Sequence, residues 1–418
     1  MLDVGLLRRA GWGIGDQVLS SLSNFIVGLL IARSVDLATF GAFSLAFSAY
    51  LIAVSVTRAF PMSPLAIRYA AADRASFRRA AAAATGTAFA AGIAGGLILV
   101  AIAAVTGGAQ SQAFLALGIT LPGLLLQDAW RSTFFASGRG RHALINDLVW
   151  VAIELPALAI ILATASGSIF AIVAAWGGSA CIAAIVGSLQ ARLLPSPLRA
   201  RAWWREHNDI ASRFIAEAVA RVASGQLMGY GVGAVVGLGA VGALRVGQLL
   251  FGPIQLVFYG VNLMAVPEAS RAAAVSLGRL RQASVVAAGL LAVGAGVWTL
   301  IVLLMPTAVG EAILKDAWAP ARDLAVPIGL TFVAGMLGFG GELGLRALAA
   351  AGRLLRVTVI TSVLTLLLGV AGAAWGGASG CAWALFAVAV IGGLLLWLEY
   401  DRAEAERAVD PTPGQAAA

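Results

Sequence analysis

Twelve apolar stretches, each about twenty residues long, fill this chain almost from end to end. About twenty helical residues cross the hydrocarbon layer of a bilayer, so each stretch is predicted to be a transmembrane helix. A composition of 60% hydrophobic and 11% charged residues excludes a soluble core of this length. We therefore expect an all-α, polytopic membrane protein. The predicted spans are 14-33, 40-61, 80-106, 113-136, 145-165, 167-190, 213-236, 241-265, 282-305, 322-345, 356-374 and 379-399.

The short links between these spans alternate between strongly basic and nearly uncharged. Most of the 28 lysines and arginines lie before the first span, in every second link after it and in the tail. The opposite links hold only Arg33, Lys315 and Arg322. By the positive-inside rule, both termini are predicted to be cytoplasmic. The net charge of +8 is explained by this topology and by contact with membrane lipid, so no nucleic-acid partner is expected.

Similar residues recur in the two halves of the chain, which indicates an internal duplication. Asp16 and Glu217 are 201 residues apart, and so are Gly28 and Gly229. Each half has an even number of spans, so the halves enter the membrane in the same direction, as parallel repeats do. The predicted organisation is an N-lobe at 1-195 with spans 1 to 6, a cytoplasmic linker at 196-212, a C-lobe at 213-400 with spans 7 to 12, and a cytoplasmic tail at 401-418.

Polar residues at helical spacing mark the faces of four spans. The first span carries Asp16, and the seventh span carries Glu217 and Arg221. In both spans these residues belong to a set that recurs every four positions. The second span carries Arg58. The eighth span has the longest pattern, at spacings of three and four, and lipid does not tolerate such a face: Arg245, Gln248, Gly252, Gln255, Tyr259 and Asn262. The structural alternative is that these groups and the small residues between them only pack helices together.

Further charges lie within the predicted spans. Glu154, in the fifth span, requires a partner, a proton or water, because a charge at mid-bilayer costs about 2.5–3.5 kcal/mol. Asp128 and Arg131 are three residues apart, and Glu342 and Arg346 four apart, so each pair is predicted to form an ion pair within one helix. No nucleotide-binding loop, nucleophile elbow or metal-ligand spacing occurs, so we expect neither an enzyme nor a metal or other cofactor.

The segment around the first two spans resembles polysaccharide flippases of the multidrug, oligosaccharidyl-lipid and polysaccharide exporter (MOP) superfamily. The first span is followed by Ala32-Arg33, and the second opens with Phe40-Gly41-Ala42-Phe43-Ser44-Leu45. The resemblance implies two six-helix lobes that rock around a central cavity by alternating access. It also implies the bacterial inner membrane as the location and proteins of polysaccharide assembly as partners.

What the resemblance implies about function is the movement of undecaprenyl-pyrophosphate-linked oligosaccharide from the cytoplasmic to the outer leaflet. On that interpretation the arginines bind the pyrophosphate: Arg245, Arg58, Arg221 and Arg131. The polar residues that bind the sugar are Gln248, Gln255, Tyr259 and Asn262. The candidates for coupling to an ion or a proton are Asp16, Glu217 and Glu154.

Two other functions stay open at this point. A cation- or proton-coupled drug or metabolite antiporter of the same superfamily would use a dominant acidic site, a role that Glu154 fits. A membrane polymerase or ligase of glycans would need a long outer loop with catalytic residues, and the longest outer link predicted, at about 306-321, is short.

Overall fold

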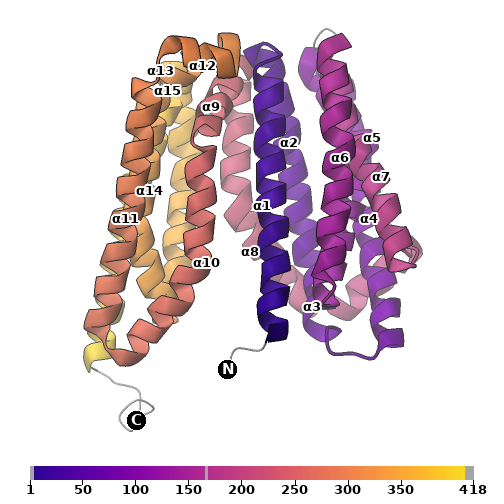
Figure 1. Ribbon diagram of the computed structural model, residues 1–418, viewed down its shortest axis with the longest axis horizontal. Coiled ribbons are helices and arrows are strands. Elements are labelled where there is room, and N and C mark those ends of the chain that lie inside the picture. The colour runs from indigo at the N-terminus through magenta and orange to yellow at the C-terminus, as the bar shows by residue number, and fades with distance from the viewer. Residues whose placement is uncertain (1–3, 165–167, 410–418) are drawn as a thin grey trace. The chain divides into compact units, whose positions relative to one another are not determined.

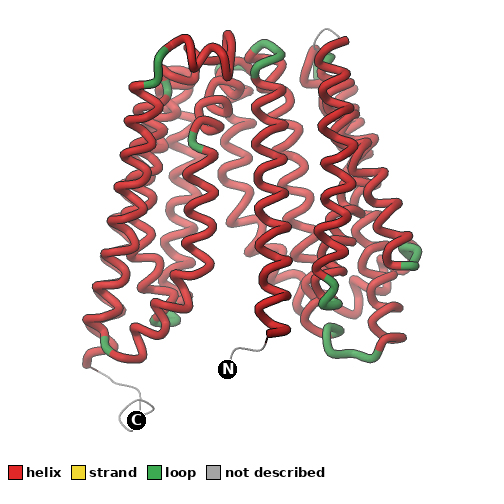
Figure 2. The backbone as a smooth tube through the Cα atoms, viewed as in Figure 1, coloured by secondary structure: helices red, strands yellow, loops and turns green. Residues whose placement is uncertain are grey.

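The computed structural model describes residues 4–164 and 168–409, and throughout these ranges the chain is built from helices joined by short loops (Figure 2). The chain divides into two compact units, Met1–Gly229 and Tyr230–Ala418. The division falls inside the helix α8 (Ala200–Val235), C-terminal to the predicted lobe boundary at 196-212. The lobe limits drawn from the sequence stay a prediction.

Unit 1 contains α1 (Val4–Ala32), α2 (Leu37–Thr57), η1 (Arg58–Met62), α3 (Ser63–Arg68), α4 (Arg74–Val105), α5 (Gly108–Ala136), α6 (Gly140–Thr164), α7 (Ile169–Ala191), η2 (Pro197–Arg199) and most of α8. Unit 2 contains the end of α8, then α9 (Leu238–Leu250), α10 (Gly252–Val275), α11 (Leu277–Leu304), α12 (Thr307–Leu314), η3 (Lys315–Ala317), α13 (Trp318–Asp323), α14 (Ala325–Ala347) and α15 (Ala351–Val409).

In unit 1, α5 is the central helix: α4, α7 and α2 all pack against it, and α6 packs against α7 and α1 (Figure 1). Glycine allows the closest approach between α4 and α5. A Cβ atom on Gly96 would lie 2.4 Å from the carbonyl oxygen of Gly118, and a Cβ atom on Gly92 would lie 2.6 Å from Cα of Pro122. Small residues at such contacts are how membrane helices pack, because lipid tails give no hydrophobic force between helices.

The turns before α2 and α4 end on an aspartate that caps the next helix. The Asp36 carboxylate accepts hydrogen bonds from the amides of Ala38 and Thr39, at 2.9 and 3.0 Å, and from the Thr39 hydroxyl at 2.6 Å. The hydroxyl bond of Thr39 is the main reason that the pKa of Asp36 lies below its usual value. Asp73 caps α4 in the same way. Residues 33–36, which join the Ala32-Arg33 and Phe40–Leu45 segments quoted above, thus make the turn and cap of α2.

The predicted linker at 196-212 is part of unit 1. It forms η2 and the first part of α8. Arg68 donates a 2.5 Å hydrogen bond to the carboxylate of Asp209, and Tyr69 donates one of 3.0 Å to Glu206. Trp203 is buried in a cluster with residues of α3 and α4. These contacts hold the start of α8 against α3 and α4.

Unit 2 repeats the order of packing seen in unit 1. The helix α14 lies between α11 and α15 and also contacts α10 (Figure 1). The long helix α15 is a hairpin, because its backbone leaves helical geometry at Gly376 and Gly377, and the φ of Gly377 is +61°. The two arms touch at glycines: a Cβ atom on Gly380 would lie 2.1 Å from the carbonyl oxygen of Gly372.

The chain is a multi-pass membrane protein, as predicted, although the count of spans differs. Of the described helices, nine are long and apolar enough to cross a membrane, or ten if α9 and α10 form one span. Three regions account for the difference from twelve. The predicted spans at 356-374 and 379-399 are the two arms of α15, and the predicted span at 213-236 is the second part of α8, which is not among the candidates.

The third region corrects a prediction about the eighth span. The segment at 241-265 consists of two helices, α9 and α10, which meet at Phe251 at a bend of 55°. Pro253 lies in the first turn of α10, where it lacks the N–H group that would continue the helix from α9. The polar residues of this segment therefore do not share one straight face.

Candidate functional site

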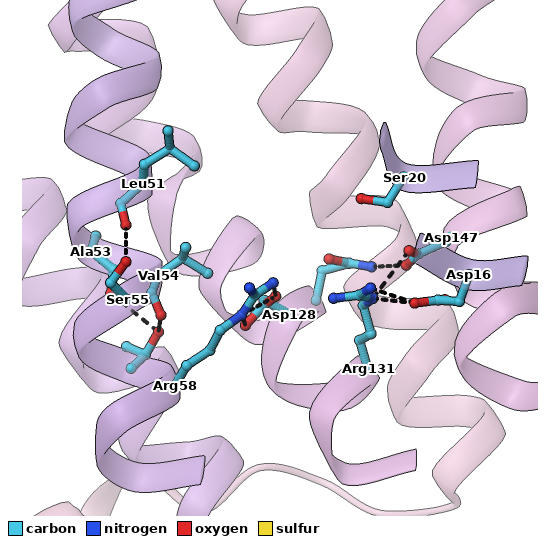
Figure 3. A network of polar contacts seen from close by, with 12 residues as sticks. Asp16, Ser20, Leu51, Ala53, Val54, Ser55, Arg58, Asp128, Arg131 and Asp147 are labelled. Carbon is cyan, nitrogen blue, oxygen red and sulfur yellow. Dashed lines mark hydrogen bonds and ion pairs between the residues drawn. The ribbon is translucent and has the colours of Figure 1, made fainter. Parts of the chain in front are cut away.

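The most charged interior region of unit 1 lies around the C-terminal half of α5. Gln127, Asp128 and Arg131 are consecutive or nearly consecutive on this helix, and the side chains of Asp128 and Arg131 point to different neighbours (Figure 3). Asp128 faces Arg58 at the end of α2, whereas Arg131 faces α1 and α6. The central position of α5 in the packing thus brings polar groups of four helices together.

Arg58 and Asp128 form a bidentate ion pair. The Arg58 Nε donates to Oδ1 and Oδ2 of Asp128 at 3.1 and 3.0 Å, and Nη2 donates to Oδ1 at 2.5 Å. The carboxylate is buried, while 51% of the Arg58 side chain is exposed. One edge of the guanidinium is therefore held by the buried carboxylate, although the Arg58 side chain as a whole is about half exposed.

Arg131 bridges two acidic side chains from different helices. It contacts the carboxylate of Asp16 in α1 through Nε, at 2.7 Å, and through Nη2, and its Nε lies 3.3 Å from Oδ2 of Asp147 in α6 (Figure 3). The three side chains are largely or wholly withdrawn from solvent. Oδ1 of Asp16 is buried and has no hydrogen-bond partner among the described residues.

Neutral amides extend this network toward α7. The Gln127 side chain donates to Oδ1 of Asp147 at 2.8 Å and to Oδ1 of Asn146 at 3.3 Å. Asn146 in turn donates to the carbonyl oxygen of Ala183 at 2.8 Å and to Gln190 at 3.2 Å. These bonds fix the rotamer of Asp147, so the ion network is a rigid arrangement of α1, α2, α5, α6 and α7.

The charges of this network do not cancel. With all groups ionised, the three carboxylates of Asp16, Asp128 and Asp147 face the two guanidinium groups of Arg58 and Arg131, which leaves one negative charge. In a low-dielectric interior an excess charge is costly. The arrangement can therefore take up one proton or one monovalent cation at low cost.

Glu154 lies beside this network and lines a small cavity in unit 1. The cavity has a volume of about 20 Å³, enough for one water molecule or a small ion, and its lining includes Asp147, Trp150, Ser20 and Asn24. Glu154 is only 4% exposed and makes no hydrogen bond or ion pair with a described residue. Trp150 presents a buried Nε1 that also lacks a partner among those residues. Glu154 thus meets the condition stated from the sequence, a mid-span carboxylate that needs a proton, a cation or water.

The two predicted ion pairs within single helices have different outcomes. The prediction for Asp128 and Arg131 is wrong, because each pairs with a residue of another helix. The prediction for Glu342 and Arg346 is confirmed by their ion pair within α14. Arg346 also reaches the side-chain oxygen of Asn262 at 3.4 Å.

The candidate residues of unit 2 do not form a comparable cluster among the described residues. Arg245 and Gln248 lie on α9 and are partly buried, whereas Gln255 and Asn262 lie on α10, beyond the 55° bend. The side chains of Tyr259 in unit 2, and of Glu217 and Arg221 in the part of α8 that belongs to unit 1, lie outside the part of the chain that the structure describes, so their assigned roles stay predictions.

The structure also brings in residues that the sequence analysis missed. Asp147 belongs to the ion network, and Gln127 and Asn146 support it. A signal for Asp147 was present: it precedes Glu154 by seven residues, so both lie on one face of α6. Asp16 and Arg131, to which the sequence analysis assigned different roles, are partners in one ion pair.

No protein-family model matches the chain, and no curated protein matches it. Solved structures do. An inward-facing multidrug resistance transporter of the MATE family, in the MOP superfamily, aligns over 94% of this chain and 96% of its own with a TM-score of 0.73 and 12% identity. This chain has the fold of the MOP superfamily.

Two further structures with this fold belong to proteins whose described functions differ. The lipid II flippase MurJ, in an inward closed conformation, covers 95% of this chain and 90% of its own, with a TM-score of 0.68 and 11% identity. A MOP superfamily transporter from Pyrococcus furiosus covers 96% and 95%, with a TM-score of 0.58 and 12% identity, and is described by a binding pocket of reversed polarity that suggests a different function. The resemblance seen in the sequence thus holds at the level of the superfamily fold.

Proposed function

We propose that this protein is a transporter, not an enzyme, and that it moves an undecaprenyl-pyrophosphate-linked oligosaccharide from the cytoplasmic to the outer leaflet by alternating access. The observation that carries the proposal is Arg58, whose guanidinium is held on one edge by buried Asp128 and whose side chain is about half exposed. A braced guanidinium with free N–H groups is suited to a pyrophosphate, because phosphate oxygens accept parallel hydrogen bonds from arginine.

Relatives with the fold support a lipid-linked cargo. One of the solved structures with high coverage is a lipid II flippase, so this fold accommodates such a cargo in at least one protein. Arg245, Arg221 and Arg131 remain proposed as further phosphate contacts, and Gln248, Gln255, Tyr259 and Asn262 as sugar contacts. Arg131 is engaged by two carboxylates within the protein, so it contributes less to binding than Arg58.

The distribution of arginine supports a bacterial inner-membrane protein with both termini in the cytoplasm. In that orientation Arg58, at the end of α2 and just before the basic link that follows it, lies toward the cytoplasmic side. An oligosaccharide assembled there reaches Arg58 with its pyrophosphate first, and its lipid tail remains in the bilayer.

A liposome assay tests this function. Purified protein is reconstituted with an undecaprenyl-pyrophosphate oligosaccharide, and the rate at which the sugar becomes accessible to an enzyme outside the vesicle is measured. We expect protein-dependent exposure of the sugar. Its rate should fall about tenfold in Arg58→Gln, because a hydrogen bond to a charged group is lost, and should recover partly in Arg58→Lys.

The matched control for this assay is Arg141→Gln, which removes an exposed arginine from the start of α6 that has no ion-pair partner among the described residues. Its rate should equal that of the wild type. Absence of any protein-dependent exposure would contradict the flippase, and equal loss in Arg58→Gln and Arg141→Gln would contradict the role of Arg58.

A second candidate function is cation- or proton-coupled antiport of a drug or metabolite, and Glu154 is the observation that favours it. A buried carboxylate without a partner, beside a network that carries one excess negative charge, is suited to bind and release a proton or a cation. Asp16 belongs to that network and Glu217 remains proposed as its counterpart in the second half.

Uptake of a fluorescent organic cation into proteoliposomes with an imposed proton or sodium gradient separates the two functions. Antiport predicts gradient-dependent uptake that Glu154→Gln abolishes, while Glu311→Gln, a change at an exposed acidic residue of α12, leaves it intact. Gradient-dependent exposure of the lipid-linked sugar, also lost in Glu154→Gln, would instead assign Glu154 to the coupling of the flippase.

A further inference from the structure

A basic pocket lies at the open end of the α15 hairpin in unit 2. It has a volume of about 670 Å³ and is formed by the turn between α14 and α15 and by the beginning and end of α15: Leu348, Ala349, Ala350, Ala351, Gly352, Arg353, Arg356, Ala403, Glu406 and Arg407. The fold at Gly376 and Gly377 is what brings residues 351–356 and 403–407 together. The pocket is thus part of the tertiary structure of unit 2 alone.

Ion pairs around the pocket leave two of its arginines without a counter-ion. Arg353 binds Glu399 at 2.7 Å and Glu406 at 2.6 Å, and Arg402 binds Glu399 at 2.6 Å. These four side chains neutralise one another. Arg356 and Arg407 line the same pocket, are exposed and have no ion pair with any described residue. Two positive charges therefore face one pocket.

An apolar surface continues from this pocket along α15. Residues three, four, seven and eleven positions after Arg356 share its face of the helix, and all of them are exposed: Val359, Ile360, Val363 and Leu367. A cationic pocket at the end of a transmembrane helix, continuous with an exposed aliphatic face, matches the two parts of a phospholipid.

We propose that this pocket binds an anionic phospholipid, with the headgroup phosphate on Arg356 and Arg407 and an acyl chain along Val359, Ile360 and Val363. A free anion would use only the arginines, whereas the lipid uses both the charge and the aliphatic face, which is why the structure favours the lipid. The site is separate from the ion network of unit 1, so it stands whether or not the proposed transport function is correct.

Native mass spectrometry of the purified full-length protein in a neutral detergent tests this site. Phosphatidylglycerol and phosphatidylcholine with the same acyl chains are titrated, and bound lipid is counted for each. We expect a phosphatidylglycerol molecule that binds in preference to phosphatidylcholine, an affinity about fivefold lower in Arg356→Gln, and a further loss in the double variant R356Q/R407Q. Arg356→Lys should retain the preference, because it keeps the charge.

The matched control is Arg279→Gln, at an exposed arginine near the start of α11 that lines no part of the pocket. Equal weakening in Arg279→Gln and Arg356→Gln would overturn the proposal, because any surface charge would then serve. Equal binding of the two lipids by the wild type would overturn it as well. The proposal would also be overturned if glycerol 3-phosphate, at a concentration equal to the dissociation constant of the lipid, displaced the lipid completely, since the phosphate alone would then account for binding. Thermal unfolding of each variant shows that it is folded.

Discussion

The two units have the same order of helix packing but place their ion pairs in different environments. In the ion network of unit 1 the acidic groups are buried and their partners come from other helices: Arg58 with Asp128, and Arg131 with Asp16 and Asp147. In unit 2 most described ion pairs lie at the ends of helices and are more exposed, as between Arg281 and Glu404. The difference shows that two units can share an arrangement of helices and still place their charged residues differently.

One pair of residues on the central helices of the two units illustrates this difference. Asp128 of α5 and Glu342 of α14 lie 214 residues apart, and we take them as equivalent positions of the two units. Asp128 is buried and pairs with Arg58 on another helix, while Glu342 is partly exposed and pairs with Arg346 one turn away. We infer that the central helices of the two units use their acidic groups differently, between helices in unit 1 and within one helix in unit 2.

The largest expected effect comes from breaking the buried network. Arg131→Met leaves Asp16 and Asp147 without their cation, which should destabilise the protein by about 3–5 kcal/mol. The thermal midpoint in detergent, followed by tryptophan fluorescence, measures the loss. Neutralising the acids in the same chain, as Asp16→Asn with Asp147→Asn, should restore part of it. A midpoint equal to that of the wild type would mean that unit 1 does not depend on its charges.

Packing at glycine should affect both units alike, by a smaller amount. Gly96→Ala in unit 1 forces a Cβ atom against the Gly118 carbonyl, and Gly338→Ala in unit 2 forces one to 2.8 Å from Cα of Gly393. Each should cost about 1–3 kcal/mol, measured by the same unfolding assay. Gly335→Ala, whose Cβ atom meets nothing within 4 Å, is the control and should be neutral. A large loss of stability in only one of the two variants would show that the units differ in packing as well as in the placement of their charges.

Surface ion pairs of unit 2 should matter less. Arg281 binds both Asp401 and Glu404, at 2.8 and 2.7 Å, yet about half of its side chain is exposed. Arg281→Gln should therefore cost less than about 1 kcal/mol, and the effect should disappear in high salt. Unfolding midpoints at low and high ionic strength measure this. A salt-independent loss of the size expected for Arg131→Met would remove the distinction between the units.

The smallest effect is expected at the pair within α14. Glu342→Gln removes an exposed contact between residues four positions apart, which is worth about 0.3–0.5 kcal/mol. The test is a comparison with Asp128→Asn at the equivalent position of unit 1, which should shift the unfolding midpoint several times further. Equal shifts would show that the repeat preserves energetics as well as helices.

Much of the fold was predictable because it follows from hydropathy. Most predicted spans coincide with one described helix or part of one, and the span at 241-265 with two, since about twenty apolar residues bury their backbone polar groups in lipid only as a helix. The misses have local causes. The bend at Phe251 depends on how α9 and α10 pack, and the Gly376–Gly377 break reverses the direction of α15 within a stretch that remains helical on both sides.

The candidate site was predictable only in its residue types. Asp16, Arg58, Arg131 and Glu154 stood out because charged groups are costly within apolar spans. Their partners were not predictable, because residues three apart on a helix, such as Asp128 and Arg131, are as free to pair with neighbouring helices as with each other. Asp147 was missed, although its spacing from Glu154 placed both on one face.

The sequence by itself determined that this chain is a helical, multi-pass membrane protein and that several charges lie within its spans, because lipid imposes both hydropathy and the cost of charge along the chain. Only the tertiary structure decided that Arg58 holds Asp128, that Arg131 bridges Asp16 and Asp147, and that Arg356 and Arg407 share a pocket. Those pairings depend on which helices are neighbours and on how they are aligned along their axes. Glycine contacts such as Gly96 with Gly118 affect both, because they let whole backbones approach one another.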